Sequence, residues 1–445
     1  MRSRISARTA GAVSVVVLAG SLVLGGGAAS GMLAARATTT APAAGVPGPA
    51  AVPGTTRVIG VPSVLRPADW HMIAIRHYGH PADASGYSAV VAPGRSGAWA
   101  FGGTNPGGNS VPVAERWIAG QWRSSPLPAH LTGFIGDASA PSSRDIWAVS
   151  YSSGYVLHWN GARWRVAKSW RQHGVLTGVT ALSATNVWVF GTTTGGFRGL
   201  GTWHFNGRTW TRAQGRANEI YRASAVSGRD IWAVAANSHG GFVEHYDGRT
   251  WQRARTGRLL AGTRLDDVLA VSRRDVWVVG NLQTRHGDGR LLIAHFDGRH
   301  WKRAVTRWDG DIGRLAPDGS GGVWVSADNT GASSDVLIGH LPRHGRPTWR
   351  TLRHGLGSGV SDIAVSRGTH DVWLSGSFLT RAGGDAALWS RGPAPVTPAP
   401  VGRVTISPAN VGLLIFRGWH QDLSGLLDLT GPISARRPSR DPVAE

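Results

Sequence analysis

The chain repeats one sequence motif, Asp275-Val-Trp-Val-Val-Gly280 followed by Ala294-His-Phe-Asp-Gly-Arg-His-Trp301. The first segment is a short, continuous apolar run, which is typical of a strand buried on both faces. The second segment is a strand, an Asp-Gly pair and a further strand that begins with tryptophan. Asp-Gly between two strands predicts a hairpin with a type I′ turn. One copy of the text therefore predicts consecutive antiparallel strands.

The copies recur at a regular interval along the chain. Close matches begin at Asp145-Ile-Trp, Asn186-Val-Trp and Asp230-Ile-Trp, and each is followed by a His-aromatic-Asx-Gly hairpin or a close variant of it. Intervals between successive marker tryptophans run from 41 to 49 residues, which with four strands per unit is typical of a β-propeller. The marker tryptophans are Trp99, Trp147, Trp188, Trp232, Trp277, Trp324 and Trp373.

The number of blades depends on how the chain ends are interpreted. Seven units lie between residues 87 and 400, and residues 402–434 resemble three strands of an eighth unit that has lost its tryptophan. The segment from Trp70 to Ile75 resembles a fourth strand without the preceding three. We therefore expect an all-β propeller over 67–434, with eight four-stranded antiparallel blades closed by the N-terminal strand. A seven-bladed ring with additional segments at its ends is the alternative.

The segments that flank the propeller predict export. Arg2, Arg4 and Arg8 precede an apolar run and small residues, so residues 1–37 are predicted to be a signal peptide, or alternatively an uncleaved membrane anchor. Residues 38–66 are rich in Thr, Ala, Pro and Gly, which predicts a disordered linker. Residues 435–445 are expected to form a disordered tail. The predicted location is secreted or extracellular, with anchoring at the cell surface as the alternative.

The composition is strongly basic and contains no cysteine. The formal net charge is +21, almost entirely from arginine, because Lys168 and Lys302 are the only lysines. Such a charge favours anionic polymers or surfaces as partners. The alternative is that the arginines, which are scattered through every repeat, are simply solvated. The lack of cysteine excludes disulfides, thiolate metal sites and cysteine-linked cofactors.

The repeat also resembles known families. Phe242-Val-Glu-His-Tyr-Asp-Gly-Arg-Thr-Trp251 resembles the kelch repeat, and more closely the Asp-Val-Trp repeats of exported actinobacterial propellers. The resemblance covers about residues 87–400 and implies a propeller fold.

Candidate binding residues lie where variable loops are expected. The loops between second and third strands, and those between blades, should emerge on one face around the channel mouth. Four aspartates near the starts of the innermost strands are expected to surround that mouth: Asp137, Asp267, Asp311 and Asp362. The loop candidates are Asn105, Asn109, Asn237, Asn281, Arg285, Asp288, Asp328, Arg381 and Asp385.

Five histidines precede the aromatic residue of the third strand or its equivalent. Equivalent positions in different blades are too far apart to share one metal ion, so we expect each histidine to bond the neighbouring blade or a turn backbone. We predict no metal, no cofactor and no catalytic residue. The histidines are His158, His204, His245, His295 and His340.

The sequence supports two functional hypotheses. The first is a monomeric, non-catalytic exported propeller that binds an anionic or glycan envelope polymer, or a protein, through its loop face and channel mouth. The chain has no phosphate-binding glycine loop, nucleophile elbow or His-Glu-x-x-His motif. The alternative is a carbohydrate-active hydrolase or lyase that uses two channel-mouth aspartates as acid and base. The predicted export argues against nucleic acid as a partner.

Overall fold

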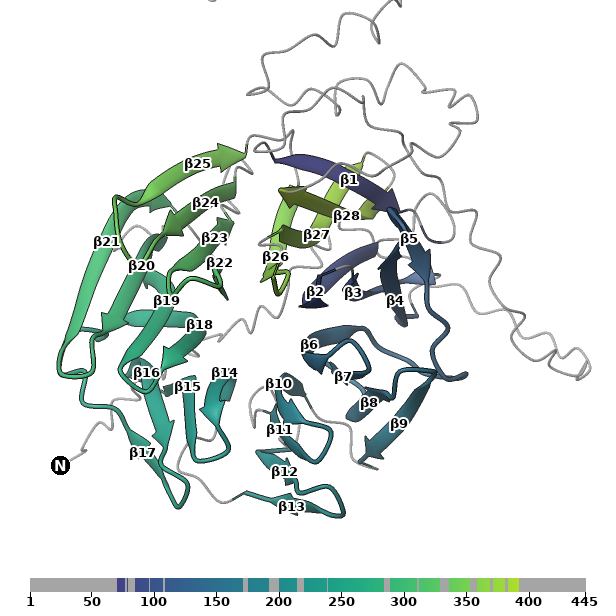
Figure 1. Ribbon diagram of the computed structural model, residues 1–445, viewed down its shortest axis with the longest axis horizontal. Helices are drawn as coiled ribbons and strands as arrows, with labels where there is room; N and C mark the ends of the chain where they lie inside the picture. Colours follow the sequence, from purple (N-terminus) through teal and green to yellow (C-terminus); the bar gives the residue numbers. More distant parts are fainter. Residues whose placement is uncertain are drawn as a thin grey trace, which may run out of the picture.

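The chain folds into a ring of antiparallel sheets around a central axis (Figure 1), as seen in a computed structural model. All its elements in the described residues are strands. None of the described residues forms a helix that could cross a membrane. The predicted leader, linker, residues 402–434 and tail lie outside the described part. The described residues are 70–391 without 77, 79–84, 96, 107–108, 171–174, 192–199, 214–219, 238, 284–288, 310–311, 329–335, 353–357, 369–370 and 381–382.

Six sheets each consist of four consecutive strands, with the first strand nearest the axis. The first blade is β2 (Ser85–Gly94), β3 (Gly97–Thr104), β4 (Val111–Ile118) and β5 (Gln121–Ser124). The second is β6 (Ile135–Ser142), β7 (Asp145–Ser150), β8 (Tyr155–Trp159) and β9 (Trp164–Ser169). The third is β10 (Leu176–Ser183), β11 (Asn186–Gly191), β12 (Trp203–Phe205) and β13 (Trp210–Arg212).

The next three blades repeat the same order. The fourth is β14 (Ile220–Ser227), β15 (Asp230–Asn237), β16 (Gly240–Tyr246) and β17 (Trp251–Arg253). The fifth is β18 (Thr263–Ser272), β19 (Asp275–Gln283), β20 (Gly289–Phe296) and β21 (Trp301–Asp309). The sixth is β22 (Ile312–Pro317), β23 (Val323–Asp328), β24 (Val336–Leu341) and β25 (Thr348–Leu352).

The seventh sheet combines both ends of the described chain. Its inner strands are β26 (Ser358–Val365), β27 (Val372–Thr380) and β28 (Gly383–Arg391), and its outer strand is β1 (His71–Arg76). The expectation of eight blades is wrong, because β1 pairs with β28 and not with residues 402–434. The sequence gives a physical reason. Four prolines follow β28 between residues 393 and 400, and proline cannot donate to a sheet ladder, so this stretch is a poor fourth strand.

The core lies between neighbouring blades. All six residues of β7 are buried, as the continuous apolar run predicts for a second strand. Marker tryptophans extend this packing from blade to blade: the Trp147 ring lies 5.8 Å from Phe205 and 6.2 Å from Trp210 of the next blade. The predicted four-stranded blades are therefore confirmed, and the marker tryptophans pack between neighbouring blades.

The Asx-Gly turns differ from the predicted type I′ geometry. Gly161 has a φ of 94° and Gly298 a φ of 89°, but the preceding Asn160 and Asp297 are not among the described non-glycine residues with positive φ. The Asn160 Oδ1 atom instead accepts hydrogen bonds from the N–H groups of Ala162 and Arg163, at 3.1 and 3.0 Å. The side chain of the Asx residue thus holds a longer connection in place.

Candidate functional site

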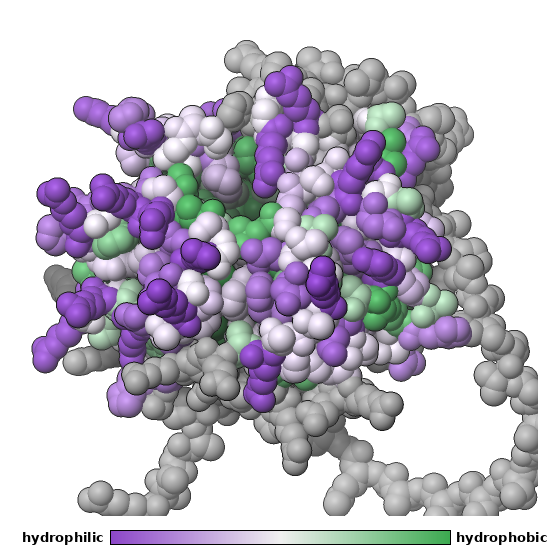
Figure 2. All heavy atoms as spheres, turned by 60° about the horizontal axis from the view of Figure 1, so that its bottom comes forward, coloured by the Kyte–Doolittle hydropathy of each residue, from purple (hydrophilic) through white to green (hydrophobic). Residues whose placement is uncertain are grey.

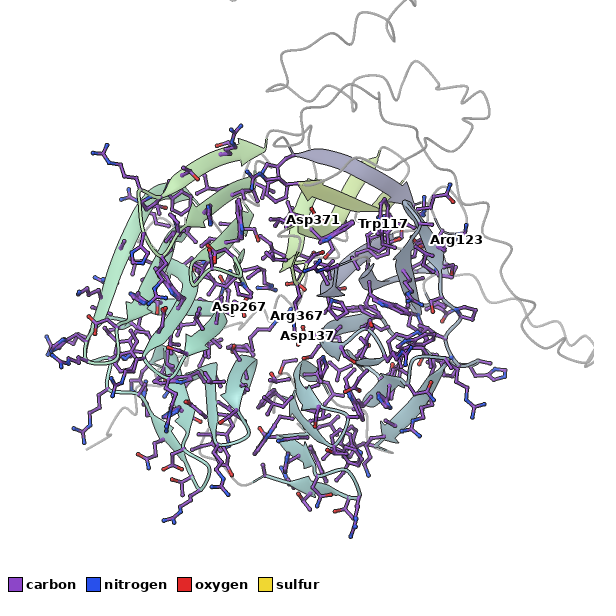
Figure 3. The ribbon with its side chains drawn as sticks, in the orientation of Figure 1. Trp117, Arg123, Asp137, Asp267, Arg367 and Asp371 are labelled. Atoms are coloured by element: carbon purple, nitrogen blue, oxygen red, sulfur yellow. The ribbon has the colours of Figure 1, made fainter. Side chains whose placement is uncertain are left out.

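A cluster of charged side chains lies on the innermost strands, which surround the ring axis. Asp137 is on β6, Arg222 on β14, Asp267 on β18, Arg314 on β22 and Asp362 on β26. Figure 3 labels Asp137 and Asp267 near the centre of the ring. A β-bulge immediately precedes the three aspartates and Arg222. Bulges re-aim the side chains that follow them, so a repeated local irregularity positions this cluster.

Each aspartate of the axial cluster bonds the backbone of the next blade. Asp137 Oδ2 accepts the Val179 N–H at 2.8 Å, and Asp267 Oδ2 accepts the Leu315 N–H at 2.9 Å. Asp362 Oδ2 accepts the N–H of Val90 at 2.9 Å and so joins the seventh blade to the first. These carboxylates therefore link adjacent innermost strands.

Arginines balance the charge of these carboxylates. Arg222 donates to Asp137 Oδ1 and is also attracted by Asp267 and Asp362, which together raise its pKa although burial acts against this. Burial raises the pKa of Asp362 to about 6, while Arg222 and Arg314 oppose that rise. The pKa values of Asp137 and Asp267 are also raised by burial against the same arginines. The cluster is thus an inter-blade network of opposite charges. Among the described residues, no group of three or more His, Cys, Asp or Glu side chains could hold a metal ion.

The other predicted site residues do not gather into one described site. Asn105 follows β3, and its Oδ1 atom accepts a hydrogen bond from the Ser110 hydroxyl at 3.4 Å. Asn109 is exposed, and its backbone N–H donates to the carbonyl of Pro106. Asn237 ends β15, where its Oδ1 accepts the N–H of His239.

Asn281 lies inside β19 with 2% of its surface exposed, so it is a strand residue and not a loop residue. Asp328 and Asp385 belong to β23 and β28, and their side chains are outside the described part. Arg285, Asp288, Asp311 and Arg381 also lie outside it.

The five histidines bond within their own blades, so the expected bond to a neighbouring blade or turn backbone is wrong. His158 Nε2 lies 2.8 Å from Asp145 Oδ1, and the same oxygen accepts the indole N–H of Trp147 at 2.8 Å. The His158 ring also stacks on Trp147, with centroids 4.1 Å apart. Histidine–Trp stacking recurs at His204, His245, His295 and His340, whose Nε2 atoms contact Asn186, Asp230, Asp275 and Asp318. In the second, fourth and fifth blades Asp, Trp and His thus form one hydrogen-bonded unit inside the blade.

The structure gathers arginines on one face of the ring. In an antiparallel blade, the turn between the first and second strands and the turn between the third and fourth strands lie at the same end. We call this end of the ring the turn face, and the opposite end the loop face. Exposed arginines occupy these turns in all seven blades; they are Arg95, Arg144, Arg163, Arg208, Arg229, Arg249, Arg273, Arg274, Arg299, Arg343, Arg346 and Arg367.

The two turns of one blade lie against each other. A Cβ atom on Gly161 would lie 3.1 Å from the Arg144 Cβ, and one on Gly248 would lie 2.8 Å from the Arg229 Cβ. The arginine stems of the first turns therefore cover the glycines of the second turns. Figure 2 shows many long hydrophilic side chains projecting from one face and the adjoining edge of the ring.

The carboxylates of the turn face are largely occupied. Asp145 and Asp230 are buried and bond the tryptophan and histidine of their blades. Exposed Asp247 accepts the N–H groups of Thr250 and Arg249, which lower its pKa. Among the described turn arginines, Arg273 forms an ion pair, with Asp230 at 3.1 Å. Because the twelve exposed turn arginines outnumber the seven described aspartates in or next to the same turns, the turn face carries a net positive charge.

Along the sequence these arginines are scattered through every repeat, which hides the face that they share. Many of them nevertheless recur at two fixed positions of the repeat. One position directly precedes the Asp of the Asp-x-Trp motif, and the other directly follows the Asx-Gly pair. Residues that recur once per blade in the same turn must return to the same face of a propeller. The period of the arginines therefore predicts the turn face.

Comparisons with known proteins support the fold alone. No family model and no curated protein matches the chain. Among solved structures, U3-55K is similar with a TM-score of 0.51 and 9% identity, over 73% of this chain and 98% of that chain. YCF48 bound to a D1 peptide has a TM-score of 0.49 and 12% identity, over 78% and 100%. A virginiamycin B lyase from Staphylococcus aureus, catalytically inactive and solved with quinupristin, has a TM-score of 0.49 and 8% identity, over 72% and 99%.

The sheet topology and the similarity to U3-55K define the class of the chain: it is a β-propeller built from repeated four-stranded antiparallel blades. Membership of the kelch or Asp-Val-Trp repeat families stays a prediction from the sequence.

Proposed function

We propose that the chain is an exported, non-catalytic propeller that binds an anionic polymer of the cell envelope across its turn face. The single observation that carries this proposal is the accumulation of exposed arginines in the turns of every blade. The predicted leader supports a location outside the cell, where phosphate-rich or carboxylate-rich polymers are available.

The geometry suits a long, repeating anion better than a small one. Each exposed arginine adds only a weak contact with a phosphate or carboxylate, because solvent and salt screen it. A polymer that spans several blades gains from many such contacts and from the release of its counterions. The proposal places the site on the turn face, whereas the sequence suggested the loop face and channel mouth.

The alternative of a hydrolase or lyase has less support. Acid–base catalysis needs carboxyl groups that can reach a substrate. Asp137 is engaged by Arg222 and by Val179, and Asp267 by Val268 and Leu315. These contacts give the axial aspartates a structural role in joining blades.

Purified poly(glycerol phosphate) is a suitable probe, with binding measured by calorimetry at several salt concentrations. The fourth blade offers matched variants with equal loss of charge. Arg229 and Arg249 lie in its two turns, while Arg255 and Arg258 are exposed in the connection from β17 to β18 at the loop face.

We expect the R229Q/R249Q variant to bind about tenfold more weakly than the wild type, which corresponds to about 1.4 kcal/mol. The R255Q/R258Q variant should stay within about twofold, since only the net charge changes. Equal losses in the two variants, or binding that does not weaken with salt, would contradict the proposal.

A further inference from the structure

Most interfaces between blades are filled by three aromatic rings. The marker tryptophan of one blade contacts an aromatic residue that ends the third strand of the next blade and a tryptophan that begins its fourth strand. The contacts are Trp99 with Trp159 and Trp164, Trp147 with Phe205 and Trp210, Trp188 with Tyr246 and Trp251, Trp232 with Phe296 and Trp301, and Trp373 with Trp117 and Trp122.

The interface between the fifth and sixth blades departs from this pattern. In the second blade His158 pairs with Arg165, and the flanking residues Trp159 and Trp164 supply the two rings. In the sixth blade His340 pairs with Thr348, so the corresponding flanking residues are Leu341 and Pro347. The blade thus presents an aliphatic side chain and a proline to Trp277, where five other blades present two aromatic rings.

The tryptophan of the sixth blade is displaced along its strand. Trp349 pairs with Gly339, two positions beyond Pro347, and its ring occupies the space that a Cβ on Gly339 would need. Its exposed fraction is 37%, which is high for so large an apolar side chain. Trp277 is only partly buried, whereas the other six marker tryptophans are at most 8% exposed.

A slot of about 530 Å³ results between the two blades. Its apolar walls include Trp277 and Ile293 of the fifth blade and Leu337, Leu341 and Trp349 of the sixth. This volume lies in the range of ligand-binding pockets. The other interfaces show what complements a marker tryptophan at this position: an aromatic ring packed edge-on or tilted against it.

The charged side chains at the rim of the slot also restrict which partner can bind. Lys302 and Arg303 belong to the slot lining, and the Lys302 side chain is 75% exposed. Lys302 Nζ lies 3.3 Å from Asp297 Oδ2, and Arg303 Nη1 donates to the carbonyl of Leu259. Two cations against one carboxylate leave the rim positive, which favours an anionic group next to the inserted ring.

We propose that this slot binds a peptide segment of a partner protein, in which an aromatic side chain is flanked by acidic residues. The aromatic ring enters between Trp277 and Trp349 and replaces the ring that the sixth blade lacks. The acidic neighbours lie at the rim with Lys302 and Arg303. The slot lies between the fifth and sixth blades next to the turn face, but it depends on an apolar contact that the polymer does not use, so either proposal can fail without the other.

The probe is a fluorescein-labelled pentapeptide, Asp-Glu-Trp-Glu-Asp, with blocked ends, measured by fluorescence anisotropy on the full chain. The control peptide replaces its tryptophan with alanine and retains all charges. We expect the tryptophan peptide to bind at least about tenfold more tightly, because only it can fill the slot. Equal binding of the two peptides would show attraction to the basic surface alone and would overturn the proposal.

Two substitutions locate the binding. Pro347→Trp restores the ring found in the other blades, so it should abolish the preference for the tryptophan peptide and raise the melting temperature. Trp349→Ala removes one wall and should reduce the preference without filling the slot, which keeps the test valid if the first variant folds poorly. A preference that survives both substitutions would place the peptide elsewhere.

One further probe separates a partner from the chain itself. The C-terminal sequence contains Phe416-Arg-Gly-Trp-His-Gln-Asp422, which also joins aromatic and acidic residues. If a peptide of this sequence binds through the slot and the acidic probe does not, the occupant is this chain's own C-terminal segment. That outcome would overturn the assignment to a partner protein.

Discussion

Arg76 Nε lies 3.1 Å from Glu115 Oε1, and this buried ion pair joins the end of β1 in the seventh blade to β4 in the first. The two side chains are 3% and 2% exposed. Arg76 Nη2 also donates to the Trp122 carbonyl at 3.0 Å, and the Tyr78 hydroxyl donates to Glu115 Oε1 at 2.8 Å. The N-terminal strand therefore contacts both blades that meet where the ring begins and ends.

Replacement of Glu115 by glutamine should destabilise the protein strongly. The amide keeps the shape of the side chain but leaves the buried charge of Arg76 without a counter-ion. Loss of one partner of a buried pair costs about 3–5 kcal/mol. The free energy of unfolding from urea titration measures this cost. Arg123→Gln, an exposed change on the neighbouring β5, should stay within about 0.5 kcal/mol and serves as the control. A similar small change for Glu115→Gln would show that the pair does not stabilise the ring.

Asp145→Ala should lower the free energy of unfolding by about 2–4 kcal/mol. The substitution leaves the indole N–H of Trp147 and the ring N–H of His158 without an acceptor in a buried site. Asp145→Asn should cost less, since its amide oxygen can still accept. The third blade shows this replacement naturally, with Asn186 Oδ1 2.9 Å from His204 Nε2. Thermal unfolding of the two variants tests the order. Equal losses would mean that the hydrogen bonds of this unit contribute little.

Trp147→Ala should destabilise the fold by about 3–5 kcal/mol, as expected for a large buried ring. Trp277→Ala should cost clearly less, because this tryptophan faces the slot of the sixth blade and is already partly exposed. Parallel urea titrations of both variants compare the two costs directly. Equal destabilisation would argue that the slot is closed in solution.

The axial cluster should make stability depend on pH in an unusual direction. The pKa of Asp362 in the folded protein is about 6, above its ordinary value of about 4 in an unfolded chain. The folded state therefore binds this proton more tightly, and the contribution of Asp362 to stability falls as the pH rises from about 4 to 6. Asp362→Asn cannot titrate, so the difference in melting temperature between variant and wild type should shift in favour of the variant between pH 4.5 and 7. A difference that stays constant with pH would rule out this titration.

The sequence identified the propeller because the signals for its blades are local. The apolar second strands and the Asx-Gly turns recur in the sequence. Each such motif is sufficient to predict the strand or the turn that it forms. The number of blades was predicted wrongly because β1 pairs with a strand more than 300 residues away in the chain. The choice between two possible partners of Trp70 to Ile75 depends on which segment lacks its own fourth strand.

The candidate site was predictable only in part. The axial position of Asp137, Asp267 and Asp362 follows from their place near the start of each first strand. The hydrogen bonds from these aspartates to the next blade could not be predicted, because they depend on β-bulges that no residue type marks. The slot beside Trp277 was also hidden, because it arises from the displacement of a single tryptophan, Trp349, by two positions along β25.

Hydrogen–deuterium exchange of the full chain with and without poly(glycerol phosphate) tests the central claim most directly. If the turn face holds the polymer, exchange should slow in the turns at residues 142–145, 227–230 and 247–250. The loop-face connection at residues 254–262 should be unchanged. Protection confined to that connection and the other loop-face segments, with no change in the turns, would contradict the assignment.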